Sequence, residues 1–386
     1  MMEYRVGVVG CGMIGRQHIE ALRRLPNVRV VAAAGRAFGA KEVGQGFFQG
    51  MNMYQDYKAM LEAENLDVVH NCTPNRFHYE INRYAFDKGV HVYCEKPFTI
   101  TTQQAEELIT IAREKGMANG VNYNYRHNAM MQEMRHRVVS GEAGPIFLVH
   151  GCYLQDWLMY DTDYSWRLDT EVGGQARALA DIGSHWFDLA QFAVGSKIQA
   201  VYAKLLTVMP VRQKPAGPVE SFAAAKEGEY TPYDVTSDDA CLIQVRFANG
   251  VYGSLTVSQV SGGHKNDLRL TVDCGNYELA WEQEDADRLQ VSSRRGGKQL
   301  IYASPNTVAK EIRHYAPLPE GHAVAWCDAL KNGFRAFYQS LDDGTYRQET
   351  QGYATFRDGL EIMQIVEACM ESNRTGQWVT VAGAEA

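Results

Sequence analysis

Short apolar segments alternate with helical patterns over the first 124 of 386 residues, and this alternation constrains the fold more than any other feature. The apolar segments lie at 4–10, 28–35, 66–74, 91–96 and 117–123. The helical patterns lie at about 14–25, 76–89 and 101–116. Nearly all-apolar strands are typical of sheets covered on both faces, and strands that take turns with helices are parallel with right-handed crossovers. The sequence therefore predicts an α/β fold with a doubly wound parallel sheet.

The pattern changes at about Asn124. Longer strands with partial polar alternation follow at 145–155, 198–208, 240–260, 268–283 and 288–293. The Asn249-Gly250 pair is a strong signal for a type I′ hairpin turn, which favours a large, mostly antiparallel sheet. Two late helices are expected at 321–341 and 351–373, and the Pro- and Gly-containing segment 210–239 is typical of a surface excursion.

A glycine motif of the form G-x-G-x-x-G stands between the first strand and the first helix. Gly10 permits the tight turn, Gly12 lets the backbone approach a pyrophosphate, and Gly15 allows the helix and strand to pack closely. Phosphates bind at a helix N-terminus, here next to Met13 and Ile14, because unpaired N–H groups and the dipole favour negative charge. We therefore expect residues 1–124 to form a Rossmann dinucleotide-binding domain.

The end of the second strand usually discriminates between the two nicotinamide dinucleotides. An acid there binds the ribose 2′-hydroxyl of NAD, but this chain has Gly35 and Arg36. Arg36 is suited to a 2′-phosphate, so we expect NAD(P) with a preference for NADP. The alternative is that Arg36 only stacks on the adenine, which leaves NAD permitted.

Composition excludes several classes of function. A formal charge of −8 and the absence of a long Lys/Arg run argue against a nucleic-acid partner. The eight cysteines are scattered without a C-x-x-C pair, which favours reduced thiols over disulfides or a metal site. No secretory leader or membrane-length apolar run is apparent, so we expect a cytoplasmic protein without a membrane partner.

Polar residues follow two further strands of the first region. Residues just past the carboxyl ends of strands in an open parallel sheet line the ligand crevice. We therefore expect one rim of the dinucleotide site to contain Thr73, Pro74, Asn75, His78, Glu95, Lys96 and Pro97.

The segment 178–192, A-L-A-D-I-G-S-H-W-F-D-L-A-Q-F, has the composition of a buried helix but carries Asp181, His185 and Asp188. Their spacing of four and three places them along one stripe of a helix. In one interpretation this stripe is the water-facing side of a half-buried helix. In the other, Asp181 and His185 are catalytic and Asp188 is structural. A zinc site that joins the pair to Cys94 lacks metal-ligand spacing.

With G-C-G-M-I-G at 10–15, C-E-K-P at 94–97 and D-I-G-S-H-W-F-D at 181–188, the chain resembles the Gfo/Idh/MocA family of nicotinamide-dependent oxidoreductases. Segments 151–158, 163–167, 177–189 and 320–338 are similar to the subgroup that contains levoglucosan dehydrogenase and enzymes that oxidise a ring hydroxyl, commonly C3, of glucosides. The resemblance implies that residues 125–386 form an α/β domain that binds a sugar or polyol and mediates formation of a homodimer or homotetramer.

The resemblance also implies roles for individual residues. Lys96 corresponds to the E-K-P lysine that contacts the reacting hydroxyl and the nicotinamide ribose, and Asp181 and His185 correspond to the D-x-x-x-H pair. Residues 73–78 match the T-P-N-x-x-H stretch beside the nicotinamide ribose, whereas Gly35-Arg36 departs from members with an acid there.

Oxidation of a secondary alcohol requires a base for the O–H proton while the hydride leaves for the nicotinamide. His185 suits neutral pH, Asp181 can orient its ring, and Lys96 can polarise the hydroxyl. A polyhydroxylated ring needs aromatic surfaces and hydrogen-bonding groups. Candidates for this role are Tyr125, Arg126, Gln155, Asp156, Trp157, Trp166, Arg167 and His322, the last at the opening of a helix. Each has a structural alternative, such as a core position for a tryptophan or an ion pair for Arg126.

We thus expect an NAD(P)-dependent sugar dehydrogenase. The alternatives are an inositol dehydrogenase, a redox-assisted glycosidase that retains its cofactor, and a non-catalytic sugar sensor. The combination of Lys96, Asp181 and His185 argues against the sensor, which needs no proton acceptor.

Overall fold

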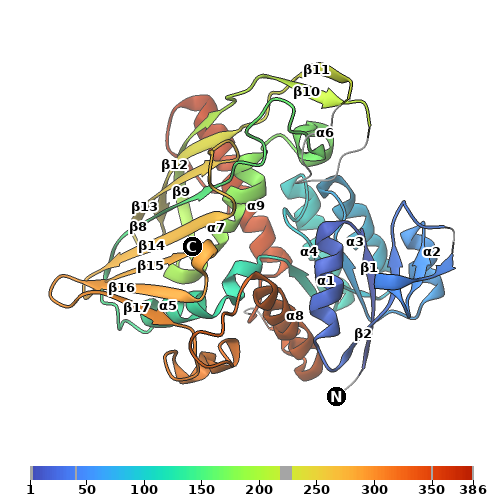
Figure 1. Cartoon of the computed structure of the whole chain (residues 1–386), viewed down its shortest axis with the longest axis horizontal. Helices are drawn as coiled ribbons and strands as arrows, with labels where there is room; N and C mark the ends of the chain where they lie inside the picture. The colour runs from blue at the N-terminus through green and yellow to red at the C-terminus, as the bar shows by residue number, and fades with distance from the viewer. Residues whose placement is uncertain (1–2, 40, 218–227, 349–350, 385–386) are drawn as a thin grey trace. The chain divides into compact units, whose positions relative to one another are not determined.

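The computed structural model describes residues 3–39, 41–217, 228–348 and 351–384. The chain divides into two compact units, of which the first comprises Met1–His127 and Cys327–Leu360. The second comprises Asn128–Trp326 and Glu361–Ala386. Figure 1 labels many of the helices and strands of both.

The first unit contains a seven-stranded sheet with the order β3-β4-β2-β1-β5-β6-β7. Every neighbouring pair is parallel except β3 and β4, so the predicted doubly wound sheet is confirmed. The strands are β1 (Tyr4–Val9), β2 (Val28–Ala34), β3 (Glu42–Val43), β4 (Asn52–Tyr54), β5 (Val68–Asn71), β6 (His91–Cys94) and β7 (Asn119–Val121). The chain leaves β1 toward β2 on one side while β5 lies on the other, which places the switch point of the topology between β1 and β5.

Helices of the first unit form where the sequence supplies caps and apolar stripes. They are α1 (Met13–Arg23), α2 (Tyr57–Ala63), α3 (His78–Asp87), α4 (Thr102–Lys115) and α8 (Trp326–Asp343). Helix α4, for example, begins at the Thr101 side chain, which accepts a hydrogen bond from Gln104 N, and ends at Gly116 with a φ of 65°.

Helix α8 belongs to the first unit although it follows the second sheet in the sequence. Its apolar face buries Phe334, Phe337 and Tyr338, and the Phe334 ring lies 4.9 Å from that of His70 and 5.0 Å from that of Tyr93. The division of the chain therefore differs from the expected single boundary after residue 124. The cause is the apolar stripe of α8, whose aromatic rings are buried against residues of β5 and β6.

The second unit contains a nine-stranded sheet with the order β17-β16-β15-β14-β8-β13-β12-β9-β18. Only β8 and β13 pair in parallel, so the predicted large, mostly antiparallel sheet is confirmed. The strands are β8 (Ile146–Leu154), β9 (Ile198–Leu206), β12 (Ala240–Phe247), β13 (Tyr252–Ser258), β14 (Asp267–Cys274), β15 (Glu278–Glu282), β16 (Arg288–Ser293), β17 (Gly297–Tyr302) and β18 (Val379–Thr380).

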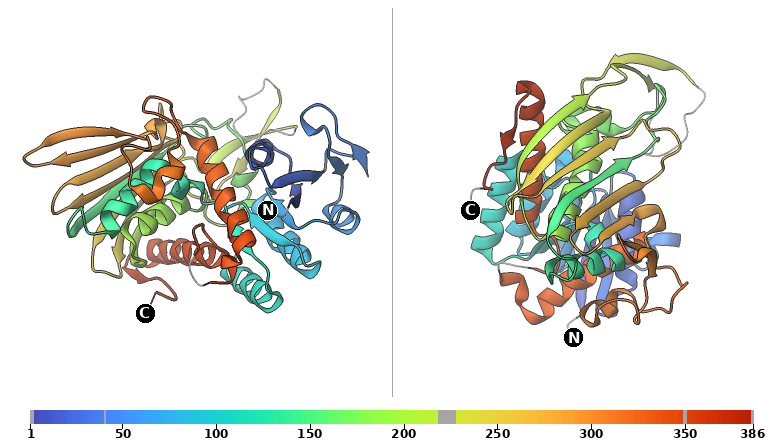
Figure 2. Two further views of the ribbon diagram at one scale, coloured as in Figure 1. Left: turned by 90° about the horizontal axis from the view of Figure 1, so that it is seen from below. Right: turned by 90° about the vertical axis from the view of Figure 1, so that its left-hand side faces the viewer.

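One face of this sheet is covered by helices. Figure 2 shows α5 (Ala129–Val139) and α7 (Ser184–Val194) against that face, where α7 packs on β8 and β14. Helix α9 (Phe356–Thr375) contributes Ser372, whose Oγ accepts a hydrogen bond from Ala203 N of β9. The other face carries alternating exposed residues, as in β12.

Two connections between strands of the second unit differ from expectation. The hairpin between β12 and β13 forms, but Phe247 N donates to Val251 O and Gly250 N donates to Phe247 O, which closes a three-residue loop. Gly250, at a φ of 87°, occupies the left-handed position of that loop, in place of the expected two-residue type I′ turn. The expected excursion at 210–239 contains a two-stranded ribbon of β10 (Val211–Pro215) and β11 (Tyr230–Asp234), and residues 218–227 lie outside the described residues.

In the described ranges no helix is long and apolar enough to cross a membrane. All eight cysteines are free thiols. No group of three or more metal-ligating His, Cys, Asp or Glu side chains occurs among the residues that the structure describes.

Candidate active site

The glycine motif forms a cradle of backbone at the switch point of the first sheet. Gly10 has a φ of 90°, and a Cβ on it would lie 2.6 Å from Cys72 O, while a Cβ on Gly15 would collide with the carbonyl oxygen of Gly10. Gly12 caps α1 and has open space on its side-chain face. Close packing at two glycines and an open approach at the third fit a dinucleotide pyrophosphate at the N-terminus of α1.

The discriminating position at the end of β2 carries no acid. Gly35 N donates to Tyr54 O at 2.9 Å, and the ring of Phe38 lies 3.2 Å from where a Gly35 Cβ would stand. The next side chain, Arg36, is exposed. An exposed guanidinium at this edge is compatible with a 2′-phosphate and with stacking on an adenine.

His78 joins the two loops that follow β5 and β6. Its Nε2 lies 2.7 Å from Thr73 O and its Nδ1 lies 2.9 Å from Pro97 O, and the ring is fully buried. Burial lowers the pKa of His78, which keeps the ring neutral at pH 7 and lets it donate to one of the two carbonyls. Thr73 Oγ1 in turn donates to Asn71 Oδ1 at 2.7 Å. The rim that carries Thr73 and Pro97 is therefore braced from within.

Lys96 follows β6 and its backbone is held by the neighbouring carboxylate. Lys96 N donates to Glu95 Oε2 at 3.1 Å. The other carboxylate oxygen of Glu95, Oε1, accepts a hydrogen bond from Asn122 Nδ2 at 2.5 Å and lies 2.9 Å from His18 Nε2. His18 was not among the predicted site residues. It lies on the buried face of α1 together with Ile19 and Leu22.

Asp181 lies in a π-helical turn, Leu179–Gly183, that runs directly into α7. Its Oδ1 lies 3.1 Å from Arg167 Nε, and its Oδ2 accepts a hydrogen bond from Gln259 Nε2 at 2.8 Å. Single π turns of this kind are frequent at functional sites. Arg167 was expected at the substrate and Gln259 was not expected at all, so the carboxylate has two basic or amide partners that the sequence pattern did not pair with it.

Two of the three residues in the stripe Asp181, His185 and Asp188 are buried, and the side chain of the third, Asp181, is 13% exposed. Asp188 is 1% exposed and His185 is 7% exposed, and the His185 ring lies 6.2 Å from the ring of Tyr153. The interpretation of the stripe as the wet side of a half-buried helix is therefore wrong for His185 and Asp188, which are enclosed along with the apolar residues of α7.

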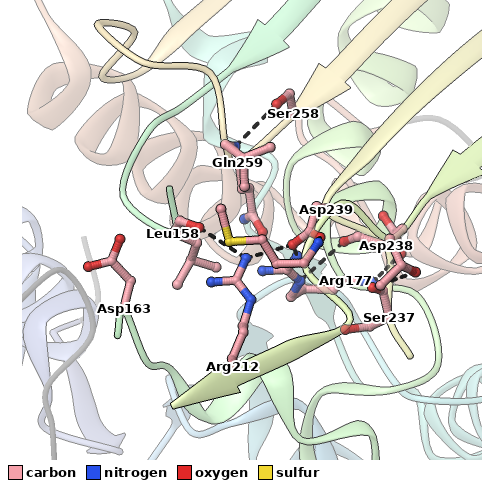
Figure 3. Close-up of polar contacts among 12 residues, drawn as sticks. Leu158, Asp163, Arg177, Arg212, Ser237, Asp238, Asp239, Ser258 and Gln259 are labelled. Atoms are coloured by element: carbon pink, nitrogen blue, oxygen red, sulfur yellow. Dashed lines mark hydrogen bonds and ion pairs between the residues drawn. The ribbon is translucent and has the colours of Figure 1, made fainter. Parts of the chain in front are cut away.

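A buried cluster of four charges supports the Asp181 turn (Figure 3). The Asp238 carboxylate accepts hydrogen bonds from Arg177 N and Leu179 N, each at 2.7 Å. The Asp239 carboxylate pairs with the guanidinium groups of Arg177 and Arg212, and the side chains of all three are fully buried. Because Asp181 N donates to Arg177 O at 2.7 Å, the cluster fixes the start of the π turn.

The same cluster reaches the loop that follows β8. Arg212 on β10 donates to Leu158 O and Tyr160 O, both at 3.0 Å. Gln259 N donates to Asp239 O at 3.0 Å, and Leu158 N donates to Gln259 O at 3.2 Å. The ribbon, the loop at 155–160 and the residue that holds Asp181 are thus linked through one set of buried charges, as Figure 3 shows for the labelled residues.

Several predicted substrate residues lie together in the second unit. Trp157 Nε1 donates to Gln155 Oε1 at 2.8 Å. The guanidinium carbon of Arg167 lies 4.5 Å from the Trp166 ring centroid and 5.8 Å from that of Trp157. These residues form an aromatic and amide group next to the Asp181 carboxylate.

Asp156 lies on the same loop but pairs away from that group. Lys265 Nζ lies 2.6 Å from its carboxylate and Gly263 N donates to it at 3.1 Å. The hydrogen bond from Lys265 lowers the pKa of Asp156. These contacts give Asp156 a structural role, because its carboxylate joins the loop after β8 to Gly263 and Lys265.

The remaining candidates occupy other places. Tyr125 and Arg126 lie in the first unit, where Arg126 Nη2 pairs with Asp358 Oδ1 at 2.9 Å, the ion pair that was its alternative. His322 is exposed in a turn and does not open a helix, because α8 begins at Trp326. Its Nδ1 lies 3.2 Å from Pro319 O. Lys96 belongs to the first unit, and Asp181 and His185 belong to the second.

Residues 4–123 match the oxidoreductase family with an NAD-binding Rossmann fold, and residues 131–278 match the GFO/IDH/MocA C-terminal domain. The chain is 27% identical to levoglucosan dehydrogenase from Pseudarthrobacter phenanthrenivorans over 99% of either chain. It is 27% identical to D-glucoside 3-dehydrogenase from Escherichia coli over 88% of this chain and 96% of that one. The crystal structure of levoglucosan dehydrogenase in complex with NADH and L-sorbose has a TM-score of 0.87 at 25% identity and full coverage of both chains.

Proposed function

Because the chain belongs to the Gfo/Idh/MocA family of oxidoreductases, we propose that it transfers a hydride between NAD(P) and a ring hydroxyl of a sugar. The substrate class we propose is a pyranoside or an anhydrosugar similar to levoglucosan, oxidised at C3. The observation that carries this proposal is the near full-length similarity to levoglucosan dehydrogenase and D-glucoside 3-dehydrogenase. The Asp181 turn supports it, because the His185 imidazole is buried there and the Asp181 carboxylate, whose side chain is 13% exposed, is held by Arg167 and Gln259.

The nicotinamide, when bound, supplies the hydride acceptor, and the residues of the chain handle the proton. We propose that His185 accepts the proton of the reacting hydroxyl and that Asp181 stabilises the imidazolium that results. Arg167 and Gln259 hold both oxygens of Asp181, which fixes the carboxylate before substrate binds. Lys96 polarises the same hydroxyl from the loop after β6, with its backbone fixed on Glu95.

Substrate recognition is proposed to centre on the group formed by Gln155, Trp157, Trp166 and Arg167. Indole faces suit the C–H faces of a pyranose ring, and the amide and guanidinium supply hydrogen-bond partners for its hydroxyls. The contacts among these four side chains support this assignment, since they are already ordered relative to one another.

Two observations bear on the preference between NAD and NADP, and they favour different dinucleotides. NADH is the dinucleotide in the complex of levoglucosan dehydrogenase with L-sorbose, which favours NAD. The absence of an acid after β2 and the exposed Arg36 favour NADP. We propose that the chain accepts both dinucleotides, and that the contribution of Arg36 is specific to NADP.

The near-ultraviolet absorbance of reduced nicotinamide tests the proposal. The purified protein is mixed with NAD or NADP and with a panel of levoglucosan, glucosides and inositols. Accumulation of reduced cofactor with a pyranoside or levoglucosan supports the proposal. Accumulation with inositols alone, or cleavage of a glycoside without accumulation, would replace it with an inositol dehydrogenase or a redox-assisted glycosidase.

We further propose that the uncovered face of the second sheet mediates homo-oligomer formation. Leu242 on β12 and Tyr252 on β13 are about half exposed there, and the Tyr252 ring lies 6.0 Å from that of Trp378. Exposed apolar groups clustered on one sheet face are typical of subunit contacts. Light scattering after size exclusion should show an oligomer that Leu242→Glu dissociates, whereas Val43→Glu in the first unit should not.

A further inference from the structure

A continuous line of hydrogen-bonding side chains runs through the interior of the first unit and ends at Glu95. Tyr338 Oη lies 3.0 Å from His70 Nε2, the Nδ1 atoms of His70 and His18 are 3.0 Å apart, and His18 Nε2 lies 2.9 Å from Glu95 Oε1. The four residues come from α8, β5, α1 and the loop after β6. Four separate segments of the chain therefore meet in one line of contacts.

The line is enclosed by aromatic rings. Tyr338 is 1% exposed, and neither histidine is exposed to solvent. The Phe334 ring lies 4.7 Å from that of His18 and 4.9 Å from that of His70, and the Tyr93 ring stacks on His70 at 5.2 Å. Reversing the donors and acceptors in such an apolar enclosure costs free energy. The reversal leaves a buried polar group without a hydrogen-bond partner, and that group is shielded from solvent.

The contacts permit one fully paired direction. The Tyr338 hydroxyl has a single partner among the described residues, so its hydrogen is paired only when it donates to His70 Nε2. His70 then carries its hydrogen on Nδ1 and donates to His18 Nδ1, and His18 carries its hydrogen on Nε2 and donates to Glu95. In the opposite direction the hydrogen of Tyr338 would have no acceptor.

The charges at the two ends agree with this direction. Burial raises the pKa of Tyr338 and is the main cause that lowers the pKa of His70, so both groups are neutral at pH 7. Burial alone would raise the pKa of Glu95, but its contacts with His18, Lys96 and Asn122 hold that pKa below its usual value. The line therefore starts at a neutral donor and ends at a carboxylate.

We infer that Tyr338, His70 and His18 form a directional hydrogen-bond chain that positions the Glu95 carboxylate and, through it, Lys96. Glu95 is the junction, since its second oxygen accepts the backbone N–H of Lys96. The three residues are positioning residues for the lysine, and this role rests on the proposed function of Lys96 in hydride transfer. Neither the Rossmann motif nor the carboxyl-end rim requires such a chain.

The first part of the test determines the direction without any substrate. NMR of the protein with nitrogen-labelled histidine rings reports which ring nitrogen carries the hydrogen. We expect His70 protonated on Nδ1 and His18 protonated on Nε2, and the opposite pair of tautomers would overturn the chain. This readout stands even if no sugar on the panel is oxidised, which would instead refute the proposed function.

The second part compares two matched variants. Tyr338→Phe removes the first donor of the chain and keeps the ring, whereas Tyr4→Phe makes the same change in a neighbouring ring, 5.4 Å away, whose hydroxyl donates to Asp342. We expect Tyr338→Phe to mix the tautomers of both histidines, to lower kcat about tenfold and to shift the pH profile of kcat, with the KM for sugar little changed. Tyr4→Phe should leave tautomers and pH profile as they are.

Thermal unfolding and dinucleotide affinity are measured for both variants. Equal losses of kcat in Tyr338→Phe and Tyr4→Phe, or unchanged tautomers in Tyr338→Phe, would show that Tyr338 acts only through packing and would overturn the inference. A loss confined to Tyr338→Phe, with dinucleotide affinity retained, supports it.

Discussion

Gln259 Nε2 donates to Asp181 Oδ2 at 2.8 Å, which joins a residue directly after β13 to the π turn before α7. Gln259 is fully buried and its backbone lies between Asp239 and Leu158. The carboxylate proposed to support His185 is thus set by a residue far from it in the sequence. The Gln259 amide is a neutral hydrogen-bond donor to one oxygen of Asp181, whereas Arg167 forms an ion pair with the other oxygen.

Gln259→Glu should impair catalysis more than Gln259→Leu. The glutamate would place a second carboxylate against Asp181, and like charges at this distance raise one of the two pKa values. We expect kcat to fall about tenfold in the leucine variant, which loses one hydrogen bond, and further in the glutamate variant at neutral pH. Steady-state kinetics against pH measure this, with Gln103→Leu on the exposed side of α4 as control. Equal activity of both Gln259 variants and wild type would contradict the role of Gln259.

Lys96→Ala and His185→Ala should each reduce kcat by at least ~100-fold, because each removes a group proposed to move or polarise the reacting proton. Dinucleotide affinity, measured by fluorescence of bound reduced cofactor, should change little. His150→Ala is a suitable control, since His150 lies on the exposed face of β8 next to Asp273. Near-normal turnover in either active-site variant would show that the roles are assigned wrongly.

Arg36→Ala should weaken the binding of NADP more than that of NAD. The guanidinium is exposed after β2, where only NADP presents a phosphate to it, and charge-assisted contacts to phosphate are among the stronger hydrogen bonds. Titration of both dinucleotides measures the two affinities. Equal losses would indicate that Arg36 stacks on the adenine, and no loss would remove it from the site.

Asp239→Asn should destabilise the second unit by about 3 kcal/mol, since it leaves two buried guanidinium groups without their shared carboxylate. Denaturant unfolding measures the free energy, and Asp234→Asn, at the exposed end of β11, is the matched control. A loss of similar size in both variants would mean that the ion pairs contribute little.

Acid should remove the same contribution. Burial alone would raise the pKa of Asp239. The charge of Arg177, the hydrogen bond from Met209 N and the contact with Arg212 outweigh burial and hold the pKa below its usual value. A depressed pKa stabilises the folded state above the unfolded value of about 3.9, and the stabilisation is lost as the pH falls through the folded value. We therefore expect the unfolding free energy of wild type to drop below about pH 4, with a shallower drop in Asp239→Asn. Parallel pH curves for the two proteins would contradict this.

The sequence was most informative where local chemistry decides structure. Gly10 and Gly15 are required by close backbone contacts that any side chain would break, so their spacing between the first strand and the first helix predicted the cradle. Alternation of apolar strands with helices predicted the first sheet, and partial polar alternation within longer strands predicted the second, because burial on one or two faces leaves a period in the sequence.

Pairings that depend on residues distant in the sequence could not be predicted. Nothing local indicates that Arg167 and Gln259 converge on Asp181, or that α8 returns to bury Tyr338 beside His70. His322 was misplaced because Gly321 resembled a helix start, while the first helical turn begins at Trp326. The stripe at 181–188 looked half-exposed because periodicity cannot tell a wet face from one that a second layer covers.

The guanidinium of Arg212 has a practical consequence for anyone who wishes to redesign this protein. A replacement for the segment 155–160 taken from a homologue would arrive without its anchor, because the carbonyls of Leu158 and Tyr160 are held from the distant strand β10. Loop and ribbon therefore have to be exchanged together, because only a graft of both keeps the hydrogen bonds that hold the loop.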